Sequence, residues 1–273
     1  MQITLVILVC TIWLCACNID NKRRSTEYNP EIYFSEKELP IAQAIFDNNK
    51  SELKNLLKNN ITDINKPGKE GYTYLLYAIK MHYYDIVEIL LKNEANPNIL
   101  SPRTFIPGAG KQSKPNDATC IESVCYNTYD IKYLKLLVKY GADVNDNRTA
   151  SPLFKSIMGD QRDKIDFLLK NGAKVNIIAK KGTAPILVAA SLTRWDLVER
   201  FLDLGADPFI EDKGYTLKNR IEYYIGRTEG TPKYREEIRA LIKRLQKMGM
   251  EFDFSKAKIQ MTDEEMRENG YLR

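Results

Sequence analysis

Apolar side chains recur along most of the chain at the three- and four-residue spacing of a helix with one buried face. In "DIVEILLKNEANPN", residues 85–98, the apolar positions are Ile86, Val87, Ile89, Leu90 and Leu91. Asparagine or glycine follows such runs. These are the residues that most readily adopt the left-handed backbone conformation found at helix C-termini. The pattern predicts a series of short helices, each with a defined C-terminal cap.

The same run returns at a nearly constant interval. Aligned on the last position of "GADVN", the copies are "SELKNLLKNNITDIN" (51–65), "DIVEILLKNEANPN" (85–98), "KYLKLLVKYGADVN" (132–145), "DKIDFLLKNGAKVN" (163–176) and "DLVERFLDLGADPF" (196–209). Consecutive copies lie 33, 31 and 33 residues apart, except between Asn98 and Asn145, where the step is 47 residues. A loop insertion rich in proline, glycine and lysine, residues 101–116, accounts for the longer step. The chain therefore repeats one unit.

A second, shorter helix is predicted upstream of each copy. Its versions are "GYTYLLYAI" (71–79), "DATCIESVC" (117–125), "TASPLFKSI" (149–157) and "TAPILVAA" (183–190). Thr73, Thr119 and Ser151 are placed to cap their helices through a side-chain oxygen. Pro152 and Pro185 fit the first helical turn, where a missing N–H costs nothing. His82 falls at the junction of two helices and is read as a turn residue.

A period of about 33 residues with a turn, a short helix, a longer helix and "GADVN" resembles the ankyrin repeat, over roughly residues 36–254. The resemblance implies an all-α ankyrin-repeat solenoid, with five recognisable repeats and a divergent capping repeat from "DKGYTLKNRIEYY" to "YREEIRALIKRLQKMG". Each unit buries its apolar face only by stacking on neighbours, so the end repeats need a polar outer face. Ser35 and Glu38 fit the pattern of a capping box at the start of the array. The last helix carries an apolar stripe at Ile238, Leu241, Ile242, Leu245 and Met248.

The first twenty residues have a different character. They carry no charge before Asp20, and the apolar run from Ile3 to Leu14 has the length of a signal-peptide core. "LCAC" resembles a bacterial lipobox, which implies cleavage before Cys17 and lipidation of that residue. We therefore expect a signal peptide (1–16), a lipidated cysteine and linker (17–34), the repeat domain (35–254) and a C-terminal tail (255–273). A buried N-terminal helix or a misassigned start codon is the alternative, because no Lys or Arg precedes the apolar run.

Composition and candidate chemistry narrow the function. The chain has 273 residues, 44% of them hydrophobic and 28% charged, with a formal charge of +5, which fits a folded protein with a mixed surface and no nucleic-acid partner. His82 is the only histidine, and "PGAGK" (107–111) lacks the spacing of a phosphate loop. Cys120 and Cys125, if on one helix, lie too far apart for a disulfide. We interpret them as buried apolar residues, with a redox or metal pair as the alternative. We expect no catalytic residue, metal or cofactor.

The resemblance also implies where a partner binds. In ankyrin repeats the variable recognition positions flank the hairpin before the first helix and precede the turn between the two helices. Carried over to this chain, the expected partner-binding residues are Lys69, Glu70, Tyr72, Lys80, Met81, Tyr126, Asn127, Asn147, Arg148, Met158, Lys180, Lys181, Ser191, Leu192, Asp212, Lys213 and Tyr215.

A lipobox followed by an ankyrin array resembles the immunity lipoproteins that block phospholipase effectors of type VI secretion. This layout implies a protein that binds and occludes a toxic lipase, as a monomer or in a 1:1 complex. It would face the periplasm from the outer membrane and touch the membrane through its lipid anchor only. The alternative is a scaffold lipoprotein that docks another envelope protein, and an unprocessed cytosolic form stays open.

Overall fold

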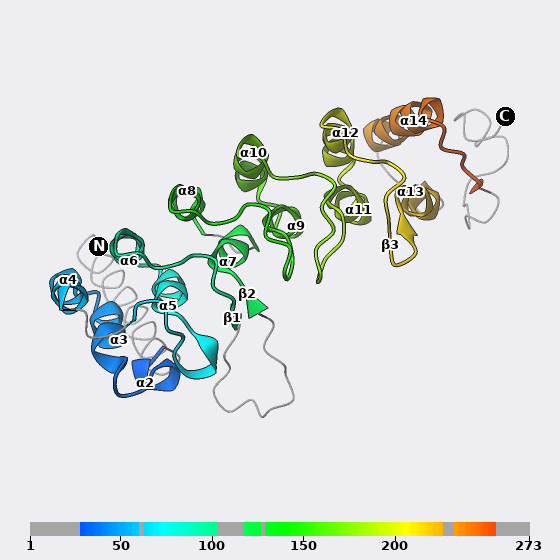
Figure 1. The fold of residues 1–273 in the computed structure, drawn as a ribbon. Helices are drawn as coiled ribbons and strands as arrows, with labels where there is room; N and C mark the ends of the chain where they lie inside the picture. Colours follow the sequence, from blue (N-terminus) through cyan, green and yellow to red (C-terminus); the bar gives the residue numbers. More distant parts are fainter. Residues whose placement is uncertain (1–27, 60–62, 103–116, 127–128, 226–231, 255–273) are drawn as a thin grey trace, which may run out of the picture. The chain divides into compact units, whose positions relative to one another are not determined.

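The computed structural model describes residues 28–59, 63–102, 117–126, 129–225 and 232–254 (Figure 1). The expectations for the signal peptide, Cys17, residues 103–116 of the insertion, Asn127 and the tail 255–273 lie outside these ranges. The described chain divides into two compact units. Unit one ends at Ser123 and also includes Lys135–Ala142, whereas unit two comprises Val124–Leu134 and the residues from Asp143 onward.

Unit one is built from antiparallel helix pairs. Its elements are α2 (Pro30–Tyr33), α3 (Leu39–Phe46), α4 (Lys50–Lys58), the 3-10 turn η1 (Lys69–Gly71), α5 (Tyr74–Lys80), α6 (Tyr84–Lys92), β1 (Ser101–Pro102) and β2 (Asp117–Ala118). Helix α3 pairs with α4 and α5 with α6, while α3 packs on α5 and α4 on α6. Helices α7 (Cys120–Tyr126) and α8 (Ile131–Lys139) fall partly in each unit.

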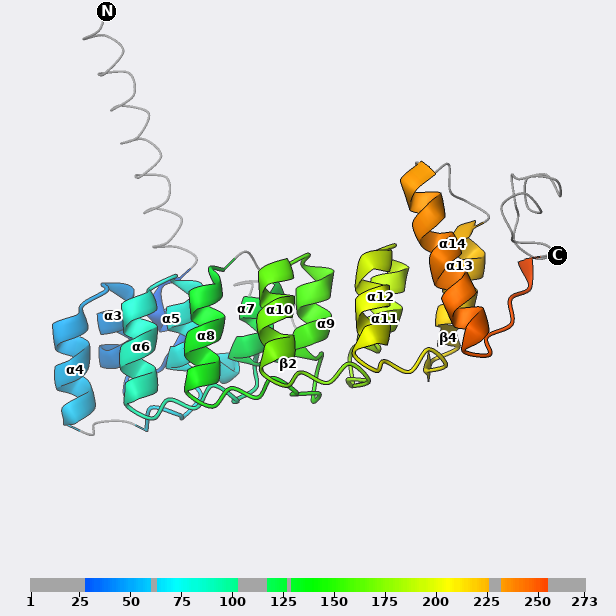
Figure 2. The same ribbon diagram turned by 90° about the horizontal axis from the view of Figure 1, so that it is seen from above.

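Unit two repeats this arrangement (Figure 2). Its elements are α9 (Pro152–Met158), α10 (Arg162–Lys170), α11 (Pro185–Ser191), α12 (Trp195–Asp203), β3 (Glu211–Asp212), β4 (Tyr215–Thr216), α13 (Leu217–Ile225) and α14 (Pro232–Lys247). The first helices stack in the order α9, α11, α13, and α12 packs on α14. The expected alternation of a short and a longer helix is confirmed, including the divergent last repeat.

The predicted N-terminal caps and the predicted turn residue are confirmed by their hydrogen bonds and backbone conformation. The side-chain oxygens of Thr73 and Ser151 each accept a hydrogen bond of 3.2 Å from a backbone N–H three residues on, and Thr119 does so at 3.5 Å. His82 has a left-handed backbone, φ 59°, at the turn between α5 and α6. Asp160 and Thr193 have the same conformation at the equivalent turns of unit two, with φ of 53° and 56°. His82 is thus a turn residue of the repeat.

The recurrent asparagines join neighbouring repeats. The Asn145 side chain donates to the Gly172 carbonyl at 3.0 Å and accepts from the Lys174 backbone N–H at 2.8 Å. Asn176 makes the same two bonds to Gly205 and Asp207, at 3.0 and 2.8 Å. In unit one Asn65 bridges to Glu94 and Asn96 in the same way. We call this series the asparagine ladder. It explains why asparagine recurs in the loops and is hydrogen-bonded there.

The two ends of the insertion are held together by a short pair of β-strands. Ser101 pairs with Ala118 and Pro102 with Asp117 in an antiparallel ladder, so the chain leaves and re-enters the repeat at adjacent points. The two strands are only two residues long, and the helix that follows them, α7, begins two residues later, at Cys120. The insertion therefore adds chain to one hairpin without displacing the helix that this hairpin precedes.

The N-terminal boundary differs from the expected one. Residues up to 34 were expected to be linker, but α2 folds onto unit one and Tyr33 and Phe34 are buried. The Tyr33 ring lies 4.6 Å from that of Tyr72, and Phe34 stacks on Tyr74 at 4.9 Å. A Cβ on Gly68 would lie 2.5 Å from the Tyr33 carbonyl oxygen, so only glycine fits there. Aromatic packing thus extends the repeat domain toward the N-terminus.

The other end of the domain matches its prediction with one exception. In α14, Ile238, Leu241, Ile242 and Leu245 are buried, as the apolar stripe predicts. Met248 was expected in the same stripe but is 42% exposed, because α14 ends at Lys247 and the chain turns away. The expected capping box at Ser35 is half formed. The Glu38 carboxylate accepts from the Ser35 backbone N–H at 2.9 Å, while the Ser35 hydroxyl donates to the same carboxylate.

Candidate functional site

The candidate partner-binding surface is best defined in unit two, where it starts at the hairpins that precede the first helices. The Lys180 backbone N–H donates to the Asn147 carbonyl at 3.0 Å, and the Lys181 N–H donates to the Thr149 carbonyl at 2.6 Å. Neighbouring hairpins therefore lie side by side in fixed register. Asn147, Lys180 and Lys181 are exposed there, as expected of recognition positions.

The third hairpin of unit two is a regular β-hairpin with two paired strands. Asp212 pairs with Tyr215 across the two-residue loop Lys213–Gly214, whose φ angles of 53° and 79° are both positive, as a type I′ turn requires. Tyr215 is 50% exposed, and the Arg220 guanidinium of α13 lies 4.4 Å from its ring centre. We call the expected recognition positions on these three hairpins the hairpin row: Asn147, Arg148, Lys180, Lys181, Asp212, Lys213 and Tyr215.

A second line of exposed groups follows the C-terminal ends of the first helices. Tyr126 ends α7, Met158 ends α9 and Ser191 ends α11. Helix α9 packs on α11, and the Tyr126 carbonyl lies against Gly159, the residue after Met158. Tyr126 is 43% and Met158 41% exposed, whereas Ser191 and Leu192 are half-buried. On α13, Tyr223 is 48% exposed, and the hydroxyl of its neighbour Tyr224 donates to the Ser191 carbonyl at 2.8 Å. We call this line the helix-end row.

The exposed side of α9 connects the two rows. The Lys155 ammonium lies 5.5 Å from the Tyr126 ring centre and 5.6 Å from that of Phe154. The Phe154 ring in turn lies beside Gly182 in the next hairpin. Sequence reasoning missed Phe154, Lys155, Arg220 and Tyr223, although their spacing on the first helices places them on the same side as the expected residues. Aromatic rings and cations on one rigid surface suit recognition of a protein.

Arg148 was expected to contact a partner, but its guanidinium forms an ion pair with Asp146. It donates to the Asp146 carboxylate through Nε at 3.1 Å and Nη2 at 2.5 Å. Burial alone would raise the pKa of Asp146, but the bonds from the Arg148 side chain and backbone N–H outweigh it and leave the pKa below its ordinary value. Arg148 therefore holds the first hairpin of the row in place, and half of its side chain stays exposed.

Two expected positions in unit one are corrected. Tyr72 is 4% and Met81 2% exposed, so neither presents its side chain to a partner. Tyr72 is buried because Tyr33 packs on it, an interaction between segments 39 residues apart that no local pattern indicates. Lys69 is exposed, but its ammonium donates to the Glu31 carbonyl at 2.7 Å, so the first hairpin binds the chain's own α2. Lys80 is half-buried, and the Glu70 side chain lies outside the described part of the structure.

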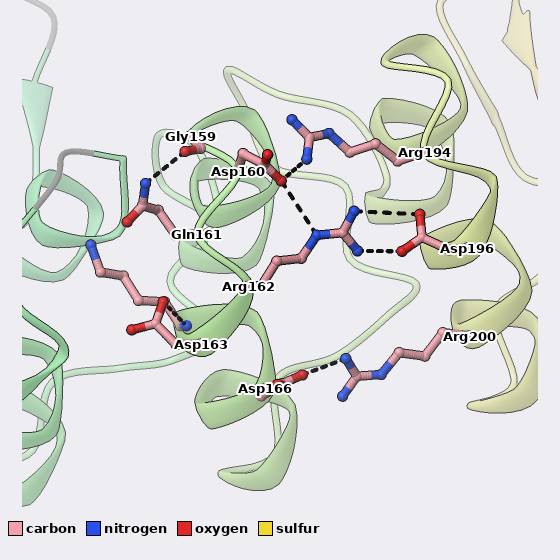
Figure 3. Close-up of polar contacts among 10 residues, drawn as sticks. Gly159, Asp160, Gln161, Arg162, Asp163, Asp166, Arg194, Asp196 and Arg200 are labelled. Carbon is pink, nitrogen blue, oxygen red and sulfur yellow. Dashed lines mark hydrogen bonds and ion pairs between the residues drawn. The ribbon is translucent and has the colours of Figure 1, made fainter.

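Ion pairs link the repeats of unit two on the second-helix side (Figure 3). Arg162 donates to Asp196 of the next repeat at 2.5 and 3.4 Å and also contacts Asp160 at 3.3 Å. Arg194 reaches back to Asp160, and Arg200 reaches back to Asp166. This side of unit two is thus largely self-compensated in charge.

Three further observations bear on chemistry. Cys120 and Cys125 are free and buried, as expected, and burial raises the pKa of the Cys120 thiol to about 12. Within the described ranges, no cluster of three or more His, Cys, Asp or Glu side chains could hold a metal ion. Nor does any helix among the described residues combine the length and apolar character that a membrane crossing requires.

Comparisons with known proteins agree with this architecture. The family model for ankyrin repeats in three copies matches residues 8–101, so it begins inside the expected signal peptide. Two fowlpox virus proteins described as ankyrin repeat proteins are 30% identical over 122 residues and 28% identical over 134 residues. An ankyrin repeat protein of Rickettsia bellii is 29% identical over 150 residues. These matches span 43%, 49% and 51% of this chain, but only 38%, 16% and 41% of the relatives' own lengths.

Among solved structures, the fold is similar to the ankyrin repeat domain of Bcl-3, a member of the IkappaB protein family. The TM-score is 0.58 at 17% sequence identity, with 75% of this chain and 85% of that chain covered. At this identity the likeness concerns the fold. The all-α solenoid of stacked helix pairs is thereby confirmed.

Proposed function

We propose that this chain, whose fold is that of ankyrin repeats, works by binding another protein on unit two and performs no chemistry of its own. One observation carries the proposal. All the large apolar side chains that are more than a third exposed among the described residues belong to unit two, and Tyr126, Met158 and Tyr223 follow the helix-end row. Such side chains dominate the energetics of protein interfaces when they fill a partner's pockets.

We further propose that the partner is a phospholipase effector of type VI secretion and that binding occludes it in the periplasm. The support is the order of segments in the sequence, in which "LCAC" precedes the repeats. A standard interface needs about 800 Å² on each partner, which several adjacent repeats can supply along one side. A scaffold role for another envelope protein is the outcome to expect if no lipase is inhibited.

The binding surface is tested by replacing Tyr126, Met158 and Tyr223 together with alanine in the full chain. We expect the affinity for the partner to fall at least about hundredfold, because buried anchors at an interface often contribute about 2 kcal/mol or more each. Inhibition of a lipase encoded beside this gene, titrated with parent and variant, measures it. An unchanged thermal melt shows that the variant is folded.

The matched control replaces three other exposed apolar residues of unit two, Ile178, Leu204 and Phe209, with alanine. It removes similar apolar surface outside the helix-end row. Equal loss in the two triple variants would contradict a defined site. Inhibition that progresses with time at substoichiometric protein would show an enzyme and contradict simple occlusion.

The lipid anchor has its own test. We expect Cys17→Ala to abolish incorporation of a fatty-acid probe and to leave the precursor uncleaved, because the lipobox makes this thiol the acceptor. Cys15→Ala, two residues earlier, should not abolish labelling. Equal label in the Cys17→Ala variant and the parent would overturn the lipoprotein assignment.

A further inference from the structure

The hairpin row contains lysines that pair with no carboxylate of the described residues. On the second-helix side of unit two, Arg162, Arg200 and Arg244 all meet carboxylates, and Arg244 contacts Glu199 and Asp203 at 2.6 and 2.7 Å. In the hairpin row, by contrast, no described carboxylate forms an ion pair with Lys180, Lys181 or Lys213. The exposed lysines of the hairpin row therefore differ from these three arginines of the second helices.

The nearby acids lie in the first and third hairpins and leave the middle hairpin uncompensated. Asp146 is 3% exposed and its carboxylate is occupied by Arg148. The third hairpin holds Glu211 and Asp212 before Lys213, and Arg220 covers the Tyr215 ring beside them. Lys218 of α13 is directed to Glu222. The middle hairpin, with Lys180 and Lys181 adjacent and exposed, is therefore the most basic point of the row.

We propose that the hairpin row binds an extended, acidic segment of the partner, which rests on the protein-binding function proposed above. Stacked helices lie about 8–10 Å apart, and the hairpins that precede them follow the same spacing. A chain in the extended polyproline II conformation advances about 3.1 Å per residue and brings every third side chain back to the same face. A carboxylate at every third residue therefore meets successive hairpins, with its strongest contact at Lys180 and Lys181.

A peptide fits this surface better than a nucleic acid. The third hairpin presents the carboxylates of Glu211 and Asp212, which would repel the continuous charge of a polyanion. A peptide can place neutral residues opposite these carboxylates. The Tyr215 ring, with Arg220 on one side, adds an aromatic surface that a peptide side chain can cover.

The test uses the full chain and a fluorescein-labelled peptide of four Glu-Thr-Thr repeats, with binding followed by anisotropy at low salt. A peptide of the same composition with its four glutamates adjacent is the comparison. We expect the spaced peptide to bind more tightly, and the Lys180→Ala/Lys181→Ala variant to lose about tenfold in affinity. The matched control Lys170→Ala/Lys174→Ala removes two exposed lysines outside the row and should leave affinity unchanged.

Three results would overturn this inference: equal affinity for both peptides, equal loss in both double variants, or tighter binding of a single-stranded DNA of equal charge. The proposed function is judged separately. If Lys180→Ala/Lys181→Ala inhibits the lipase like the parent while the Tyr126, Met158 and Tyr223 variant does not, the acidic segment is refuted and the protein-binding surface stands.

Discussion

Lys164 shows most clearly how a single residue departs from the repeat. It occupies the position in α10 that Ile86 and Leu197 fill in other second helices, and its side chain is fully buried. The ammonium donates to the Val124 carbonyl at 2.9 Å, in the last turn of α7 and two residues before Tyr126. A buried cation at the C-terminus of a helix interacts favourably with its dipole. Lys164 therefore supports the end of the helix that presents Tyr126.

This environment predicts a specific pH dependence. Burial lowers the pKa of Lys164 below its ordinary value of 10.5, although Cys125, Asp163 and Asp130 oppose the shift. Between the lowered value and 10.5 the unfolded chain holds the proton and the folded chain does not, so this group makes stability rise with pH. We expect the stability of the parent relative to Lys164→Met to increase as pH approaches 10.5. Urea unfolding at several pH values measures it.

The control is Lys170→Met, at an exposed position of the same helix. Its stability relative to the parent should show no such trend over the same pH range. A constant difference between parent and Lys164→Met would show that the ammonium is not desolvated in the folded chain.

At the scale of elements, loops and hairpins hold the helices in register as much as the helices themselves do. The asparagine ladder ties the loop after one second helix to the loop after the next, and the ion pairs of Figure 3 tie the second helices together. Exposed ion pairs contribute about 0.2–1 kcal/mol each, whereas a hydrogen bond that satisfies a backbone group contributes about 1 kcal/mol. The ladder is therefore the stronger of the two devices.

Asn145→Ala should lower the free energy of unfolding by about 1–2 kcal/mol, because it removes the bonds to both Gly172 and Lys174. Asn147→Ala is the matched control, since the Asn147 side chain is exposed two residues further on. Denaturant melts of the two variants give the comparison. If Asn147→Ala cost as much as Asn145→Ala, the ladder would have no special part in stability.

At the scale of the whole molecule, stability arises from neighbours rather than from one central core. Leu168 in α10 is fully buried within unit two. Leu168→Ala should cost about 2–5 kcal/mol through lost burial and the cavity left behind. Because each repeat contacts only its neighbours, hydrogen exchange should increase first in α9–α12. Leu204→Ala, at a 51% exposed position, is the control and should change little. A uniform increase along all repeats would contradict local coupling.

Much of the fold is predictable from sequence because it depends on short-range signals. Thr73 and Ser151 cap their helices, and His82 takes the turn, through interactions within four residues. The candidate site is less predictable. Tyr126 and Met158 are exposed as expected, but Tyr72 is buried by a segment that no repeat pattern describes. Contacts between residues far apart in the sequence, such as Tyr33 and Tyr72, form only when the repeats have packed together. They are therefore visible in the structure and not in the sequence pattern.

The asparagine ladder also bears on how such a chain can grow. In unit two each repeat contains both parts of the joint: the side chain that reaches forward from Asn145 or Asn176, and the loop backbone that receives the previous one at Gly172 or Gly205. A tandem gene duplication of one unit therefore copies a complete connector along with the helices. At position 209 phenylalanine replaces the asparagine. A repeat inserted before this point can therefore form the asparagine hydrogen bonds to both neighbours, whereas a repeat added after it cannot. We expect natural length variation to fall on the N-terminal side of Phe209.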